Sequence, residues 1–215
     1  VRRTISLSTS VIPVEYRDVK INLLDTPGYT DFIGEVISAM RVADGAILLV
    51  DAVNGLEVGT EIAWDYASKF NLPRFLLINK MDRDNANFQK ALKSVEDFSD
   101  VRLIPIQLPW GEKQDFKGVI DLLSMKAYKA QGKTAEEIPA DLKGAAEDAR
   151  MKLVEAAAEG DDTLLEKYLD SGSLTEEEVI KGLALIVQSG GFVPVVVSAA
   201  NNETGIIRLL DALVD

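Results

Sequence analysis

The sequence contains no cysteine and no histidine among its 215 residues. Without cysteine the chain forms neither disulfides nor cysteine-ligated metal sites, and a cytoplasmic location is the default expectation. Without histidine it lacks the side chain that most often serves as a general base and as a transition-metal ligand. It also lacks any apolar run of the ~18 residues that a membrane-spanning helix needs. We therefore expect no membrane partner.

Basic residues are outnumbered by acidic ones, 23 against 35, so the formal net charge is −12. Much of the excess lies in residues 131–181, which hold 14 acidic against 6 basic residues. Such a chain repels phosphates, so we expect neither nonspecific nucleic-acid binding nor sequence-specific DNA binding. The acidic segment is either a solvated helical surface or a docking face for a basic partner.

Short apolar runs alternate with segments of helical periodicity in the first half of the chain. The runs predict buried strands at residues 19–24, 46–50, 75–78 and 101–107, and a further strand at 192–197. The periodic segments predict helices at residues 31–43, 57–70, 85–97 and 206–214. This alternation predicts an α/β fold with a doubly wound, mainly parallel sheet, in which ligands sit at the carboxyl ends of the strands.

The alternation stops after residue 107. Residues 116–121 and 126–129 are typical of short strands, and residues 139–159, 164–169 and 175–187 of helices. Thr175 with Glu178 three residues later has the pattern of a helix-capping box. We therefore predict an α+β insert at 108–190 within a sheet domain made of residues 1–107 and 191–215.

A polar loop follows the first predicted buried strand. It reads Asp25-Thr26-Pro27-Gly28. A carboxylate at a strand end can hold Mg²⁺, directly or through water. Gly28 lets a backbone amide approach a terminal phosphate and gives the loop freedom to move when that phosphate leaves. An ordinary Asp-Pro-Gly turn is the plain alternative.

A more specific loop, Asn79-Lys80-Met81-Asp82, follows the strand at 75–78. Guanine presents its N1–H and its exocyclic amine as adjacent donors, and one carboxylate, Asp82, can accept from both. Adenine cannot satisfy that carboxylate. Asn79 can hold neighbouring loops, while the stem of Lys80 can lie along the ring. A capped strand-to-helix turn is the alternative.

Ser198-Ala199-Ala200 follows the last predicted strand and supplies small residues whose backbone can approach a base edge. The three motifs occur in the order of the phosphate-sensing, guanine-reading and base-supporting elements of a GTPase. A glycine-rich phosphate loop ahead of them is missing from the sequence. We therefore expect a P-loop GTPase-like domain that is N-terminally truncated and lacks the first strand, the P-loop and the first helix.

The chain resembles the GTP-binding domain of translational GTPases of the elongation factor G type over nearly its whole length. The residues that carry the resemblance are Asp25–Phe32, Glu35–Val36, Met40–Arg41, Asp44–Ala46, Asp51–Ala52, Gly55, Thr60–Glu61 and Asn79–Asp82. Those that resemble the family's insert subdomain are Gln107–Gly111, Phe116–Asp121 and Met125–Tyr128.

The resemblance implies binding of GTP and GDP with Mg²⁺, and GTP hydrolysis coupled to ribosomal translocation. It implies the ribosome as partner, with a ribosomal stalk protein meeting the acidic insert. Nucleotide contacts are expected from the motif residues Asp25, Thr26, Pro27, Gly28, Asn79, Lys80, Asp82, Ser198, Ala199 and Ala200. Without a phosphate loop, the present stretch is expected to be inactive on its own.

Two positions depart from the family pattern. Tyr29 stands where the family has the histidine that orients the attacking water, next to Gly28. A phenol cannot become a cation near neutral pH as an imidazole can. Ser6 aligns with a threonine that binds Mg²⁺, so Asp25 and Ser6 are the expected metal ligands. We expect a variant elongation factor G lineage with slower or differently triggered hydrolysis.

Two other interpretations remain open. One is a ribosome-protection or release-type translational GTPase, against which the insert motifs argue. The other is a degenerate, nonhydrolysing module for ribosome or stalk binding. Tyr29 allows the second interpretation, whereas the intact loop from Asn79 to Asp82 argues against it.

Overall fold

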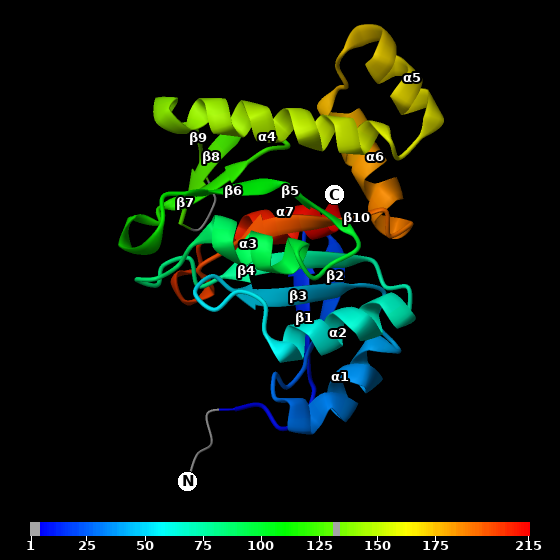
Figure 1. Ribbon diagram of the computed structural model, residues 1–215, viewed down its shortest axis with the longest axis vertical. Coiled ribbons are helices and arrows are strands. Elements are labelled where there is room, and N and C mark those ends of the chain that lie inside the picture. The colour runs from blue at the N-terminus through cyan, green and yellow to red at the C-terminus, as the bar shows by residue number, and fades with distance from the viewer. Residues whose placement is uncertain (1–4, 131–133) are drawn as a thin grey trace.

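A four-stranded parallel sheet lies at the centre of the computed structural model, which describes residues 5–130 and 134–215 (Figure 1). Its strands lie in the order β3-β4-β10-β5. They are β3 (Ala46–Asp51), β4 (Arg74–Asn79), β10 (Phe192–Val197) and β5 (Arg102–Pro105). Because β10 lies between two strands from the first half of the chain, the segment between β5 and β10 is an excursion that returns to the same sheet.

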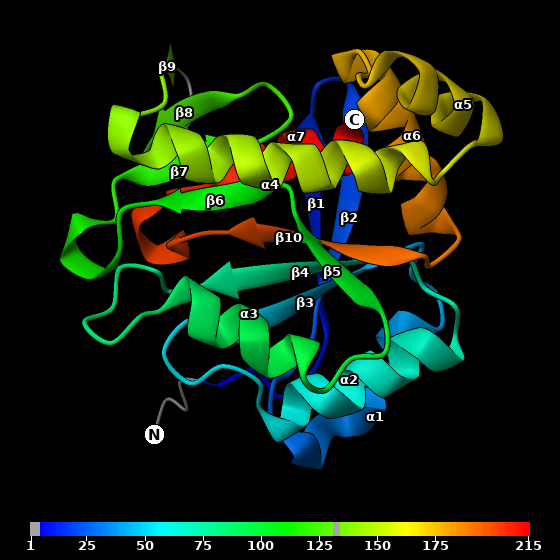
Figure 2. The same cartoon turned by 45° about the horizontal axis from the view of Figure 1, so that its top comes forward.

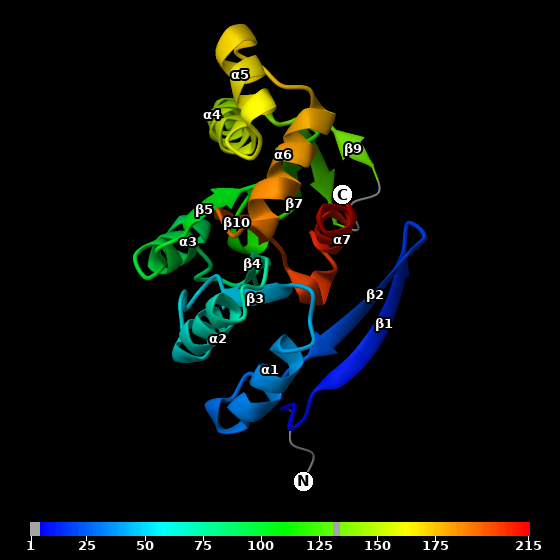
Figure 3. The same cartoon turned by 90° about the vertical axis from the view of Figure 1, so that its right-hand side faces the viewer.

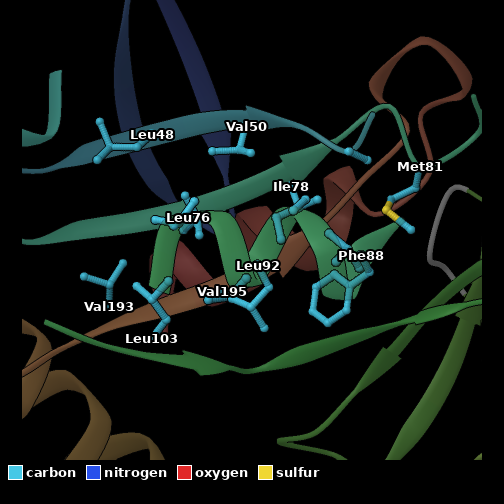
Figure 4. Close-up of a cluster of buried hydrophobic side chains, with 14 of the residues drawn as sticks. Leu48, Val50, Leu76, Ile78, Met81, Phe88, Leu92, Leu103, Val193 and Val195 are labelled. Carbon is cyan, nitrogen blue, oxygen red and sulfur yellow. The ribbon is translucent and has the colours of Figure 1, made fainter. Parts of the chain in front are cut away.

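Helices cover both faces of the parallel sheet, since successive strand residues point to opposite sides. Leu76 and Ile78 pack in one cluster with α2 and α3, whereas Leu77 packs in a second cluster with α7 (Figures 3 and 4). The helices of this part are α1 (Ile33–Met40), which follows a 3-10 turn at Thr30–Phe32, α2 (Val58–Lys69), α3 (Phe88–Glu96) and α7 (Ile206–Val214). The predicted doubly wound architecture is confirmed.

The strands β1 (Ser10–Tyr16) and β2 (Val19–Asp25) form an antiparallel hairpin of their own. The prediction that residues 19–24 enter a buried sheet is therefore wrong. Among the described residues β2 pairs only with β1, and Val11 and Val19 are 65% and 43% exposed. An apolar run favours extended backbone but does not choose the strand with which that backbone pairs.

The turn of this hairpin is fastened to helix α7. Arg17 and Asp18 both have left-handed φ angles, as a tight two-residue hairpin turn requires. The hydroxyl of Tyr16 donates to Asp211 at 2.9 Å, and Arg17 forms an ion pair with Asp215 at 2.6 Å. The hairpin therefore has one end on the C-terminal helix and the other at the loop that begins at Asp25 (Figure 3).

The excursion between β5 and β10 forms a second sheet with three helices. The strands lie in the order β6-β7-β8-β9 and are all antiparallel. They are β6 (Gln107–Trp110), β7 (Gly118–Asp121), β8 (Lys126–Lys129) and β9 (Ala135–Glu136). The helices are α4 (Ala140–Ala158), α5 (Asp162–Ser171) and α6 (Glu176–Gln188). Figure 2 shows α4 lying across this sheet. The predicted α+β insert is present, while its domain boundaries at 108 and 190 stay a prediction.

One residue joins the two sheets. We predicted a single strand over 101–107, but the chain changes sheets at Ile106, which separates β5 from β6. The amide of Ile106 donates to the carbonyl of Val195 at 3.0 Å, and its carbonyl accepts from the amide of Leu122 at 3.0 Å. Leu103, Ile104 and Ile106 are all buried, so burial of apolar residues continues across the change, and Pro105 beside it is the one local signal in the sequence.

Helices α4 and α6 cross with almost no space between their backbones. A Cβ on Gly182 of α6 would lie 2.1 Å from the carbonyl oxygen of Ala157 in α4. The predicted capping box is present at the start of α6, where the side chain of Thr175 and that of Glu178 each bind the other's backbone amide. Across residues 5–130 and 134–215, none of the helices combines the length and apolar character needed to cross a bilayer.

Candidate functional site

The residues Asn79 and Ser198 come together because they end neighbouring parallel strands. Strand β10 pairs with β4 with Val197 opposite Ile78, so the loops that follow both strands leave from the same edge of the sheet. The amide of Ser198 donates to the carbonyl of Ile78 at 2.9 Å, and the amide of Met81 donates to the carbonyl of Ser198 at 3.2 Å. The ladder between the strands thus continues into the two loops and makes them one unit.

The side chain of Asn79 ties this unit together. Its Oδ1 accepts from the hydroxyl of Ser198 at 2.9 Å and from the amide of Ala200 at 3.0 Å. Ser198 and Ala199 are buried, and Ala200 is exposed at the start of a 3-10 turn. The geometry gives Asn79 the loop-holding role that its position in the sequence indicated.

The carboxylate of Asp82 lies on the exposed side of the same unit. Its Oδ2 accepts from the side-chain amide of Asn202 at 3.2 Å. Sequence reasoning missed Asn202. Its place near the end of the loop after β10 was the available signal, but an asparagine in a loop is too common for that signal to single it out.

A second residue that sequence reasoning left without a role, Asp51, binds the side chain of Lys80. The Nζ of Lys80 donates to Oδ2 of Asp51 at 2.6 Å. Burial alone would raise the pKa of Asp51, but hydrogen bonds from the Lys80 ammonium and from the amides of Val53 and Asn54 outweigh it and hold that pKa below its usual value. In the sequence, the available signal was that Asp51 directly follows a predicted buried strand. In the structure, Asp51 lies opposite Asn79 of β4.

The insert also contacts the Asn79–Asp82 loop. The amide of Lys113 donates to the carbonyl of Met81 at 3.0 Å, and the side-chain amide of Gln114 donates to Asp84 at 3.1 Å. Met81 itself is fully buried. The loop is therefore fixed from the sheet, from the loop after β10 and from the insert.

The Asp25-Thr26-Pro27-Gly28 loop lies apart from this unit, and no hydrogen bond between them is found in the described part of the chain. Asp25 is exposed at the end of β2, and Pro27 is buried. The carbonyl of Gly28 faces the start of α2, where a Cβ on Gly59 would lie 3.3 Å from its oxygen. Glycine at 59 therefore lets the loop approach this helix closely.

Of the remaining predicted residues, Thr26 is half-buried, whereas Tyr29 and Ser6 are exposed. Tyr29 is 57% exposed just before the 3-10 turn at Thr30–Phe32. Ser6 is in a coil ahead of β1, whereas Asp25 is opposite Ser10 in the hairpin register. In the ranges 5–130 and 134–215 no cluster of three or more acidic side chains could hold a metal ion. The metal roles of Asp25 and Ser6 and the catalytic roles of Tyr29 and Gly28 stay predictions.

The polar groups gathered around Asn79 fit a guanine base. Asp82 presents a carboxylate on the exposed side, as a pair of adjacent N–H donors requires. The Oδ1 of Asn79 is bound to the neighbouring loop, so its side-chain NH₂ is the group left to donate to a ligand. Beside it Ala200 is small and exposed, whereas Ala199 is buried with its amide and carbonyl bonded to Thr204. A carboxylate acceptor of this kind is the group that we expect to recognise guanine and not adenine.

Comparison with known proteins agrees with this geometry. The family model described as the elongation factor Tu GTP binding domain matches residues 1–215. A crystal structure of a protein from Thermus thermophilus is similar, with a TM-score of 0.89 and 33% sequence identity over 97% of this chain. The chain spans about a third of the length of that protein, since it covers 32% of it. The chain therefore belongs to the family of elongation factor Tu-type GTP-binding domains, whose members bind guanine nucleotides.

Proposed function

We propose that this chain is the GTP-binding domain of an elongation factor G-like translation factor, which couples GTP hydrolysis to ribosomal translocation in the cytoplasm. The observation that supports the proposal is the unit formed by Asn79, Asp82 and Ser198, in which Asn79 binds Ser198 and the carboxylate of Asp82 lies on the exposed side. The insert supports the elongation factor G type, because it lies where that type differs from the tRNA-delivering factor.

Phosphate and metal binding are assigned to the loop after β2 and to the coil before β1. Asp25 would hold Mg²⁺ together with Ser6, and the amide of Gly28 would meet the terminal phosphate. The metal would neutralise charge on the phosphates. The sequence supplies no glycine-rich phosphate loop, whose amides, lysine and metal ligand make up most of a phosphate site. This stretch alone should therefore bind nucleotide weakly and not hydrolyse it.

The proposal is tested by calorimetric titration of GDP, GTP and ATP into this chain and into the whole protein. We expect guanine-selective binding in the whole protein and much weaker binding in this chain. Because adenine cannot donate two hydrogen bonds to the carboxylate of Asp82, ATP should bind neither to this chain nor to the whole protein. If the whole protein fails to bind guanine nucleotides, the proposal is wrong, and the Asn79–Asp82 loop is a structural turn.

The ribosome is the proposed partner, and a stalk protein is proposed to meet the acidic insert. Helices α4, α5 and α6 carry most of that acidic surface, which suits a basic partner. We expect intact ribosomes to stimulate GTP turnover by the whole protein, and ribosomes stripped of their stalk to stimulate it less. Equal stimulation by both would exclude the stalk as the insert's partner.

The same assay tests Tyr29. This residue is exposed beside Gly28, where it can place a hydroxyl near water. Positioned groups that act on the attacking water contribute about 10²–10⁴-fold to a rate, so Tyr29→His should raise ribosome-stimulated turnover by about tenfold or more. Unchanged turnover would show that the residue at this position is not limiting. If neither the wild type nor Tyr29→His turns over GTP, the nonhydrolysing ribosome-binding module is favoured. Tyr29 in place of histidine is the observation that makes this module the second candidate.

A further inference from the structure

The carboxylate of Asp51 is the most firmly held acidic group near the Asn79–Asp82 loop. Asp51 ends β3, and its Oδ1 accepts from the amide of Val53 at 2.8 Å and from that of Asn54 at 3.4 Å. The loop then closes on itself, since the amide of Gly55 donates to the carbonyl of Asp51 at 2.8 Å. With its side chain 14% exposed, Asp51 is a fixed group on a rigid strand end.

The second carboxylate oxygen of Asp51 holds a group that is otherwise mobile. Its Oδ2 is 2.6 Å from Nζ of Lys80, whose side chain is 49% exposed. A lysine side chain has many rotamers, and fixing it costs conformational entropy. Lys80 also has a left-handed φ of 64°, which is uncommon for a residue with a side chain. The ion pair thus sets the direction of a long side chain that leaves from a tightly constrained backbone.

We propose that Asp51 is a positioning residue for the guanine site, and that it acts by fixing Lys80 rather than by touching the nucleotide. This inference rests on the proposed guanine binding of the same loop. With Lys80 fixed in advance, binding does not have to immobilise it, and its methylene stem is already placed to lie along a base. The end of β3 therefore supports the base site through Lys80 and does not itself contact the base.

A double-mutant cycle on GDP affinity in the whole protein tests the inference. Asn at position 51 keeps the oxygen that the amides of Val53 and Asn54 bind but loses the charge that holds Lys80. We expect Asp51→Asn to weaken GDP binding by up to about tenfold, the effect of ordering one flexible side chain. Lys80→Ala should weaken it by at least as much. The double variant should bind like Lys80→Ala alone, because Asp51 then has nothing to position.

The control is Glu159→Gln, which removes an ion pair with Arg102 of similar length, 2.8 Å, away from the loop. It should leave GDP affinity unchanged. Thermal melts check that each variant folds. If Asp51→Asn does not fold, Asp51→Ser, which also keeps a side-chain oxygen, takes its place.

The outcomes separate the inference from the proposed function. If wild type binds GDP and Asp51→Asn binds it equally well, the inference is wrong and the proposed function stands. If Asp51→Asn loses the same factor in the Lys80→Ala background as in wild type, Asp51 acts on the loop as a whole and not through Lys80, which also overturns the inference. If wild type itself does not bind GDP, both fall together.

Discussion

The Asp82→Asn variant of the whole protein is expected to bind GDP about a hundredfold more weakly than wild type and to gain affinity for xanthosine diphosphate. Guanine offers two N–H donors to the carboxylate. An asparagine oxygen accepts one of them, while its amide faces the other, donor to donor. Loss of a hydrogen bond to a charged group costs about 1.5–3 kcal/mol, and about 1.4 kcal/mol is a factor of ten. Xanthine carries a carbonyl in place of the exocyclic amine and so matches asparagine.

Calorimetric titration of both nucleotides measures this exchange. Asp84→Asn is the matched control, since it neutralises an exposed carboxylate two residues further along that binds Gln114 rather than Asn202. It should leave the preference for guanine intact. If both variants lose GDP affinity to the same degree, net charge and not base reading explains the loss, and Asp82 does not read the base.

The second large effect is expected at the crossing of α4 and α6. Gly182→Ala places a methyl group 2.1 Å from the carbonyl oxygen of Ala157, where neither backbone can yield without moving a helix. Overpacking of this kind costs about 1–3 kcal/mol or more, and each kcal/mol lowers the melting temperature of a domain this size by about 2–4 °C. We expect the variant to melt about 3–10 °C lower than wild type.

The control for this variant is another helical glycine of the insert. Gly144 of α4 is exposed, and a Cβ there would meet nothing within 4 Å. Gly144→Ala should therefore stabilise the chain by about 0.5–1 kcal/mol, because alanine favours the helix. Differential scanning calorimetry compares the two substitutions directly. Equal melting temperatures would mean that the helices can separate at Gly182 without cost.

The sequence predicts the elements of this chain well where periodicity and end signals coincide. The strands at 192–197 and 126–129 and the helix at 206–214 have the bounds predicted for them. The capping box of Thr175 and Glu178 marks the start of α6 in the sequence and in the structure. Signals of this kind are local, since they depend on the residue and its near neighbours in the chain.

The sequence does not predict which strands pair with one another. The apolar run at 19–24 belongs to a hairpin outside the parallel sheet, and the run at 101–107 serves two sheets through Ile106. The same limit applies to the site. Asn79 and Asp82 carry a recognisable motif, whereas Asp51 and Asn202 enter only because folding brings them within hydrogen-bond distance of Lys80 and Asp82. No spacing along the chain encodes those contacts.

The single residue between β5 and β6 has a mechanical consequence. Because Ile106 hydrogen-bonds into both sheets, no linker is present there to act as a hinge. The insert is fixed a second time where the amide of Lys113 meets the carbonyl of Met81. We therefore expect a force applied to the far end of the insert to be transmitted to the backbone beside Asp82. If the proposed function holds, we expect a partner that pulls on the insert to change the rate of nucleotide exchange.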